Sequence, residues 1–282
     1  MTSPDPTPGV RVAAVGDVHA GADAESVQRL RDGFAHLAHH ADLLLLAGDL
    51  TRCGGPDEVA VVADAVRDAG VPVAAVLGNH DLHADRGDDV VATLEDAGVT
   101  VLEGGTTRVD VRGTTVGVAG VKGFGGGFAG ACTSEFGEPE TKAFARHAVE
   151  VADRLGAALH DVADADLRIA LLHYSPVRDT LQGEPPEIFP FLGSYLLAEA
   201  IDATGADLAV HGHAHRGSER GMTPGGVRVR NVAQPVIRAA YRVYELHPSD
   251  RATVAVGGVR PDAAPPAPGH DSRSHDHEET RP

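Results

Sequence analysis

The sequence is poor in positive charge and in cysteine. Its 282 residues include 24 Lys and Arg but 41 Asp and Glu, which gives a formal net charge of −17 at pH 7, and Lys122 and Lys142 are its only lysines. A protein that binds long nucleic acid needs a basic surface, so we expect no such partner. The two cysteines, Cys53 and Cys132, can form one bridge at most, which excludes a disulfide framework.

The sequence also lacks a long apolar run. No stretch approaches the roughly 18 apolar residues of a membrane span, and the first ten residues have neither the positive start nor the apolar core of a signal peptide. A hydrophobic content of 42% is nevertheless enough to build a protein core. We therefore expect a cytoplasmic protein without a membrane span.

Composition divides the chain into three parts. Residues 1–9 contain three prolines and no apolar periodicity, which predicts a flexible N-terminus. Residues 261–282 are rich in proline, acidic residues and histidine and offer almost nothing to bury, so we expect a disordered tail. Residues 10–260 show no internal repeat and no linker, and we interpret them as one layered α/β domain.

Within this domain, short apolar runs alternate with helical patterns. Up to residue 98 the order is βαβαβα, and the apolar runs are typical of strands buried on both faces. Three shorter runs, 99–102, 107–111 and 115–121, are separated by turn residues and favour antiparallel pairing. A long helix around residues 144–159, two further buried strands and a final β region over 227–256 complete the expected order.

Five of the apolar strands are followed by polar residues. These clusters are Gly16-Asp17-Val18-His19, Gly48-Asp49, Gly78-Asn79-His80-Asp81, His173, and Gly212-His213-Ala214-His215. The carboxyl ends of neighbouring strands in an open α/β sheet face one crevice, where ligands bind. We therefore expect the five clusters to form a single site.

The residue types in these clusters indicate a metal site. The candidate ligands among them are two carboxylates, one carboxamide and four or five imidazoles without a cysteine, a set that suits Mn²⁺ or iron, with Zn²⁺, Ni²⁺ and Co²⁺ also compatible. Seven candidate ligands are too many for one ion but match two ions that share a carboxylate. Paired metals of this kind serve in-line displacement at phosphorus.

The ordered set of motifs resembles the calcineurin-like metallophosphoesterases. The matching residues are Asp17-Val18-His19, Gly48-Asp49-Leu50-Thr51-Arg52, Gly78 to Asp81, His173, and Gly212 to His215. The resemblance spans about three quarters of the chain. It implies two mixed β-sheets packed as a sandwich and flanked by helices.

The resemblance also implies a role for each matched residue. Asp17, His19 and His215 would hold one metal ion, Asn79, His173 and His213 the other, and Asp49 would bridge them. A hydroxide that bridges the metals would attack phosphorus in line. His80 would protonate the leaving oxygen or stabilise charge, Asp81 would orient His80, and Arg52 would support the phosphate or its loop.

The function implied is hydrolysis of a small phosphate ester, with a phosphodiester favoured as in the small bacterial phosphodiesterases. A phosphomonoesterase acting on a nucleotide or sugar phosphate, or a non-catalytic metal-binding scaffold, stays open. The oligomeric state is not indicated. We interpret His211 as a structural or supporting residue. The glycine-rich loop over residues 122–130 and the segment 173–190 are candidate rims of the site, with Phe124 or Phe128 touching the substrate.

Overall fold

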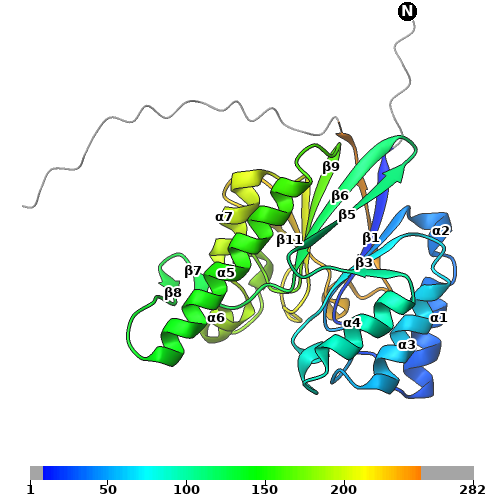
Figure 1. Cartoon of the computed structure of the whole chain (residues 1–282), viewed down its shortest axis with the longest axis horizontal. Coiled ribbons are helices and arrows are strands. Elements are labelled where there is room, and N and C mark those ends of the chain that lie inside the picture. The colour runs from blue at the N-terminus through cyan, green and yellow to red at the C-terminus, as the bar shows by residue number, and fades with distance from the viewer. Residues whose placement is uncertain (1–8, 249–282) are drawn as a thin grey trace, which may run out of the picture. The chain divides into compact units, whose positions relative to one another are not determined.

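The apolar runs of the sequence form buried strands in the computed structural model, which describes residues 9–248. Two sheets lie face to face (Figure 1). The first sheet has the strand order β13 (Arg242–Leu246), β1 (Val10–Val15), β2 (Leu43–Ala47), β3 (Val73–Val76) and β4 (Val99–Val101). The second sheet has the order β11 (Arg220–Met222), β12 (Arg228–Asn231), β10 (Leu208–His211), β9 (Leu167–Leu172), β6 (Thr114–Val121) and β5 (Gly105–Val111).

Both sheets are mixed. Strands β1 to β4 run parallel and β13 pairs antiparallel with β1, while β12, β10, β9 and β6 run parallel between the antiparallel edge strands β11 and β5. A two-stranded hairpin of β7 (Gly127–Phe128) and β8 (Ala131–Cys132) lies outside both. The predicted sandwich of two mixed sheets is confirmed.

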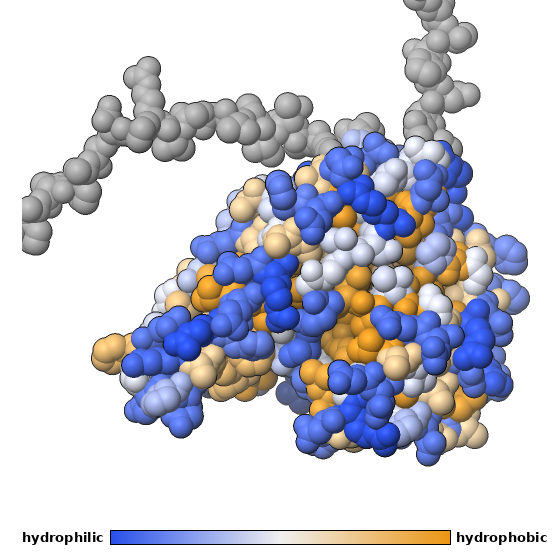
Figure 2. Space-filling model, in the orientation of Figure 1, coloured by the Kyte–Doolittle hydropathy of each residue, from blue (hydrophilic) through white to orange (hydrophobic). Residues whose placement is uncertain are grey.

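Helices cover the outer faces of the sandwich. The first sheet is covered by α1 (Ala24–Phe34), α3 (Pro56–Arg67) and α4 (Gly87–Asp96), and the second by α5 (Pro139–Asp161) and α7 (Tyr195–Thr204) (Figure 1). Figure 2 shows mainly hydrophilic residues along the exposed sides of α4 and α5. The shorter helical elements are α2 (Leu37–His40), α6 (Phe189–Leu192), α8 (Gln234–Ile237), η1 (His80–Leu82), η2 (Asp179–Leu181) and η3 (Pro186–Ile188).

Strand β9 shows how one apolar run serves two layers. Its alternate residues Leu167, Ile169 and Leu171 join the core between the sheets, whereas Ala170 and Leu172 join the core beneath α5 and α7. Successive side chains of a strand point to opposite faces, so a strand buried on both sides is apolar along its buried length; Arg168, near the start of β9, is only half-buried. The continuous apolar runs therefore form the centre of the sandwich.

Two parts of the predicted pattern differ in the structure. The run at 99–102 forms β4, which pairs parallel with β3 rather than antiparallel, because α4 returns the chain to the same end of the sheet. The β5–β6 hairpin is antiparallel as predicted, and it turns at Arg112 and Gly113, both with positive φ. Within 227–248, two strands are separated by α8 instead of forming one β region.

The strand ends that carry polar clusters meet at one edge of the sandwich. The Gly16 N–H donates to Val232 O at 2.9 Å, and the Gly212 N–H donates to His173 O at 3.2 Å, so loops from different strands are joined there. The predicted tail over 261–282, residues 1–8 and residues 249–260 lie outside the described residues. Within 9–248, no helix is long and apolar enough to cross a membrane.

Candidate metal centre

The loops after the strands hold four polar residues in an unusual backbone conformation. Asp17, His19, Asp49 and His213 have φ values of 56°, 43°, 49° and 69°. Residues other than glycine rarely adopt positive φ, and they do so at a cost that the surrounding structure must offset. Four such residues at one edge of the sandwich indicate a functional site there, because the strained backbone fixes the direction of their side chains.

Two glycines make room for carboxylates at this edge. A Cβ at Gly78 would collide with the Asp49 side chain, and a Cβ at Gly212 would collide with the Asp17 carboxylate. In the structure, these two glycines let the backbone of one strand end approach an acidic side chain from another.

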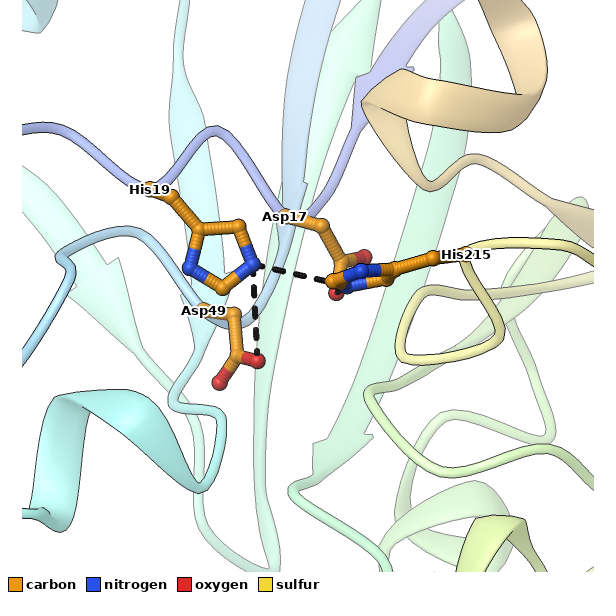
Figure 3. Close-up of side chains that lie close together, drawn as sticks. All are labelled: Asp17, His19, Asp49 and His215. Carbon is orange, nitrogen blue, oxygen red and sulfur yellow. Dashed lines mark hydrogen bonds and ion pairs between the residues drawn. The ribbon is translucent and has the colours of Figure 1, made fainter.

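The first group of potential ligands comes from loops of both sheets (Figure 3). Asp17, His19, Asp49 and His215 each offer one atom, and these atoms all lie within 4.8 Å of one another. His215 Nε2 is 2.8 Å from Asp17 Oδ1, and His19 Nε2 is 3.4 Å from His215 Nε2. Both carboxylates are almost fully buried.

A second group shares Asp49 with the first. Asp49, His173 and His213 also offer atoms within 4.8 Å of one another. His173 Nε2 lies 3.4 Å from Asp49 Oδ1 and 3.1 Å from Asn79 Oδ1, which places the Asn79 carboxamide in the same group. The structure thus brings together all seven residues that the resemblance assigned to metal binding.

Backbone carbonyls fix the orientation of three imidazoles. His173 Nδ1–H donates to Ala47 O at 2.9 Å, and His80 Nδ1–H donates to Arg52 O at 2.7 Å. His213 Nε2–H donates to Phe191 O at 3.2 Å. Since a carbonyl can only accept, the neutral rings of His173 and His213 each carry a free lone pair on the other ring nitrogen. This is the arrangement in which histidine binds metals.

Burial shapes the charges of the centre. It raises the pKa of Asp17 to about 6 and lowers the pKa values of His173 and His213 to about 3. Burial also lowers the pKa of His19, whereas the hydrogen bond with Asp17 raises that of His215. Neutral imidazoles are the form that ligates metals, so burial favours the binding-competent state.

The donor set fits two metal ions. Lone pairs of imidazole nitrogens and carboxylate oxygens converge from several directions; the two ring nitrogens of His19 and His215, for example, are 3.4 Å apart. Such convergence is favourable only when a proton or a cation lies among the lone pairs, and a bound metal ion would satisfy several of them at once. Nitrogen and oxygen ligands without sulfur suit Mn²⁺, iron or Zn²⁺.

Asp81 does not orient His80, contrary to the expectation from sequence. Its carboxylate accepts hydrogen bonds from Leu50 N–H, Thr51 N–H, the Thr51 hydroxyl and Gly78 N–H, at 2.7–3.2 Å. The group bound to the His80 ring is the Arg52 carbonyl. Asp81 therefore ties the loop after β2 to the loop after β3, because its buried oxygens face backbone donors rather than the imidazole.

His80 and Arg52 lie at the surface of the centre. His80 Nε2 is 4.0 Å from Asp49 Oδ2, its backbone N–H donates to Asp49 Oδ1, and 45% of its side chain is exposed. The Arg52 guanidinium pairs with Asp23 at 3.0 Å and reaches Ser26. Arg52 thus supports the site through its carbonyl, while its side chain is held by residues at the start of α1.

Sequence reasoning missed Lys122 and Tyr174. Lys122 directly follows β6, and Tyr174 follows His173 with its ring 4.3 Å from that of His213. Like the other residues of the centre, Lys122 follows an apolar strand. It also begins the glycine-rich segment, which the sequence indicated only as a rim of the site. Of the two phenylalanines considered for the rim, Phe128 is buried, whereas Phe124 packs 6.0 Å from Tyr174.

His211 is structural, one of the two roles considered for it. It is fully buried, its Nδ1–H donates to Gly212 O, and its Nε2 lies 2.8 Å from the Thr180 hydroxyl. Thr180 in turn bonds with Ser175. This network joins the segment after β9 to the loop that carries His213. The candidate rim over 173–190 is therefore fixed at its base, with η2 and η3 along its length.

Comparison with known proteins agrees with this geometry. The model of the calcineurin-like phosphoesterase family matches residues 10–217. Phosphopantetheinyl hydrolase from Mycobacterium tuberculosis is 17% identical, with a TM-score of 0.62 over 84% of this chain and 96% of that one. GAP50, the anchor in the inner membrane complex of Plasmodium, is 13% identical, with a TM-score of 0.52 over 81% and 73%. At these identities the likeness shows the fold. No curated protein gives a significant match.

Proposed function

The chain belongs to the calcineurin-like phosphoesterase family of metal-dependent phosphoric ester hydrolases, and from this premise we propose that it hydrolyses a small phosphodiester at a two-metal centre. The observation that carries the proposal is the position of Asp49, whose carboxylate belongs to both ligand groups. Asp17, His19 and His215 would hold one ion, Asn79, His173 and His213 the other, and Asp49 both.

Two bound metal ions would supply a nucleophile at neutral pH and stabilise negative charge on the phosphoryl oxygens. Mn²⁺ or iron is our first choice for both positions. His80, when protonated on Nε2 as well as on Nδ1, would donate its Nε2 proton to the leaving oxygen. Its Nε2 faces the centre, its Nδ1 is held by Arg52 O, and its exposed side chain is accessible to a substrate. Asp81 and the Gly78 backbone would hold Asp49 in place.

The acidic chain favours a substrate with few negative charges. A monoester carries up to two negative charges, whereas a diester carries one, so the net charge of −17 favours the diester. The net charge of −17 opposes a long polyanion, so a small substrate in the cytoplasm is the natural choice.

The first experiment compares bis(p-nitrophenyl) phosphate with p-nitrophenyl phosphate in the presence of Mn²⁺. The wild type is measured beside Asp49→Asn, which removes a charge from both metal positions, and Asp153→Asn, a matched control at an exposed position of α5. We expect faster turnover of the diester, loss of turnover in Asp49→Asn and no change in Asp153→Asn. Metal analysis is expected to give two ions per wild-type chain and fewer in Asp49→Asn.

Each other outcome has a definite meaning. Preference for the monoester would identify a phosphomonoesterase acting on a nucleotide or sugar phosphate. Two bound ions with no turnover of either ester or of dinucleotides would support a metal-binding scaffold. Faster cleavage of single-stranded DNA than of dinucleotides would contradict the preference for small substrates.

A further inference from the structure

Lys122 lies at the same edge of the second sheet as the histidines of the centre. Strands β6 and β9 run parallel, with Val121 opposite Leu172, so Lys122 and His173 follow adjacent strands at the same level. The backbone N–H groups of His173 and Tyr174 both donate to Lys122 O, at 2.9 and 3.0 Å. Lys122 therefore continues the row of polar residues that begins with the strand-end histidines.

The Lys122 ammonium lies beside rings that contact this histidine cluster. Its Nζ is 5.3 Å from the centre of the Tyr174 ring and 5.5 Å from that of Phe124. The Tyr174 ring in turn lies 4.3 Å from the ring of His213 and 5.5 Å from that of His173. Burial beside these rings removes part of the water around the ammonium, which strengthens its attraction to an anion.

No carboxylate among residues 9–248 lies within ion-pair distance of this ammonium. The Glu103 carboxylate is nearby, but it accepts the backbone N–H of Lys122 at 3.0 Å and pairs with Arg154 at 3.4 Å. Burial lowers the pKa of Lys122 because the charged form loses water. A half-buried ammonium with three donors and no ion-pair partner is suited to bind an anionic ligand.

We propose that the Lys122 ammonium binds a phosphate oxygen of the substrate at the metal centre. The inference rests on the proposed function, because it adds a binding residue to the same site. The other cation considered for this task, Arg52, is paired with Asp23, whereas Lys122 is not paired with any described carboxylate. In this arrangement the Lys122 ammonium contacts the phosphate from the part of the site where His173 and Tyr174 lie.

The alternative is that Lys122 only packs against Phe124 and Tyr174. Both interpretations require the methylene chain, but only phosphate binding requires the charge in the presence of the ligand. Lys122→Met retains most of the apolar side chain and removes the charge, and Lys122→Arg retains the charge. The chain offers a matched control in Lys142, its only other lysine, which lies on α5.

The first test measures binding of inorganic phosphate to Mn²⁺-loaded protein by calorimetry. Loss of one charge-assisted hydrogen bond is expected to weaken binding by about 10- to 100-fold in Lys122→Met. Lys122→Arg and Lys142→Met are expected to remain within about threefold of the wild type, since a change of that size is smaller than the loss of one such bond. Equal affinity of the wild type and Lys122→Met would overturn the proposal.

The second test uses the wild type alone and so does not depend on folding of a variant. Acetylation of Lys122 and Lys142 by an amine-reactive ester is followed by peptide mass spectrometry in Mn²⁺-loaded protein. Phosphate is expected to slow acetylation of Lys122 and leave that of Lys142 unchanged. Unchanged acetylation of Lys122 at saturating phosphate would contradict the proposal.

These measurements separate the inference from the proposed function. Phosphate binding that depends on Lys122, without turnover of any ester, would refute hydrolysis and leave the binding role intact. Diester turnover with phosphate affinity independent of Lys122 would support hydrolysis and refute the role of this lysine.

Discussion

Replacement of Asp81 by Asn separates two roles for this buried residue. The substitution preserves shape but converts an acceptor into a group that is half donor. Asp81 Oδ1 accepts from Thr51 N–H and the Thr51 hydroxyl, and Oδ2 accepts from Leu50 N–H and Gly78 N–H. Whichever oxygen becomes an NH₂ group, two donors lose their acceptor, and at least one of these is a buried backbone N–H.

The magnitude follows from these contacts. A hydrogen bond to a charged acceptor contributes about 1.5–3 kcal/mol, so two lost bonds correspond to about 3–6 kcal/mol. Burial raises the pKa of Asp81, which shows that the charge itself is costly to bury, and a neutral amide avoids this cost. We therefore expect a loss near the lower end, about 3 kcal/mol. For a domain of this size that lowers Tm by about 6–12 °C.

Calorimetric unfolding in metal-free buffer measures this loss, with the exposed Asp153→Asn as the control. Mn²⁺ affinity is expected to fall as well, because Asp81 holds the loop that carries Asp49. An unchanged Tm and unchanged Mn²⁺ affinity would refute the reasoning. A shifted pH profile of turnover without a loss of stability would instead show that Asp81 acts through His80.

Three further predictions concern packing, charge and metal. Gly78→Ala forces a Cβ into Asp49, so we expect weaker Mn²⁺ binding and a stability loss of about 1–3 kcal/mol, measured by metal titration and urea unfolding. Burial alone would raise the pKa of Asp42, but hydrogen bonds from Arg112 and Arg11 hold this pKa well below its ordinary value. Asp42→Asn is therefore expected to cost about 2 kcal/mol in urea unfolding at pH 7. The difference from wild type shrinks as the pH falls below about 4, because Asp42 then takes up a proton in the unfolded chain while it stays ionised in the native state down to its lowered pKa; a constant difference would exclude this carboxylate as its source. When the free metal ion is present at 100 times its Kd, its removal by a chelator is expected to lower the unfolding free energy by about 3 kcal/mol. An unchanged Tm would show that the native state binds no metal.

The layers of the fold were predictable because of how the strands are buried. Runs such as Leu43–Ala47 are apolar at every position, and in a run this short between turn signals the pattern is typical of a strand covered on both faces. The direction of β4 was not predictable from its own residues. Val99–Val101 is too short to indicate a partner, and its parallel pairing is fixed by the path of α4.

The site was predictable where the motif itself carries the chemistry, and less so where contacts cross between loops. The order of Asp, Asn and His motifs led to a group of seven residues that the fold places together. The partner of Asp81 could not be read from its neighbour His80, because adjacent residues of a turn point in different directions. Lys122 was missed because its surroundings come from Phe124 and Tyr174, which only the fold brings to it.

The pairing of β1 with β13 means that the order of the chain can be changed without moving the centre. Val10 lies opposite Leu246, so the ends of the described domain are adjacent, and they lie a strand's length of about 20 Å from Asp17. A short linker could join them, and the exposed turn at Gly130 offers a position for new termini. Such a circular permutant keeps every strand and every polar cluster in place. Its Mn²⁺ affinity should equal that of the unpermuted protein, since the centre depends on which strand ends lie together in the fold and not on their order along the chain.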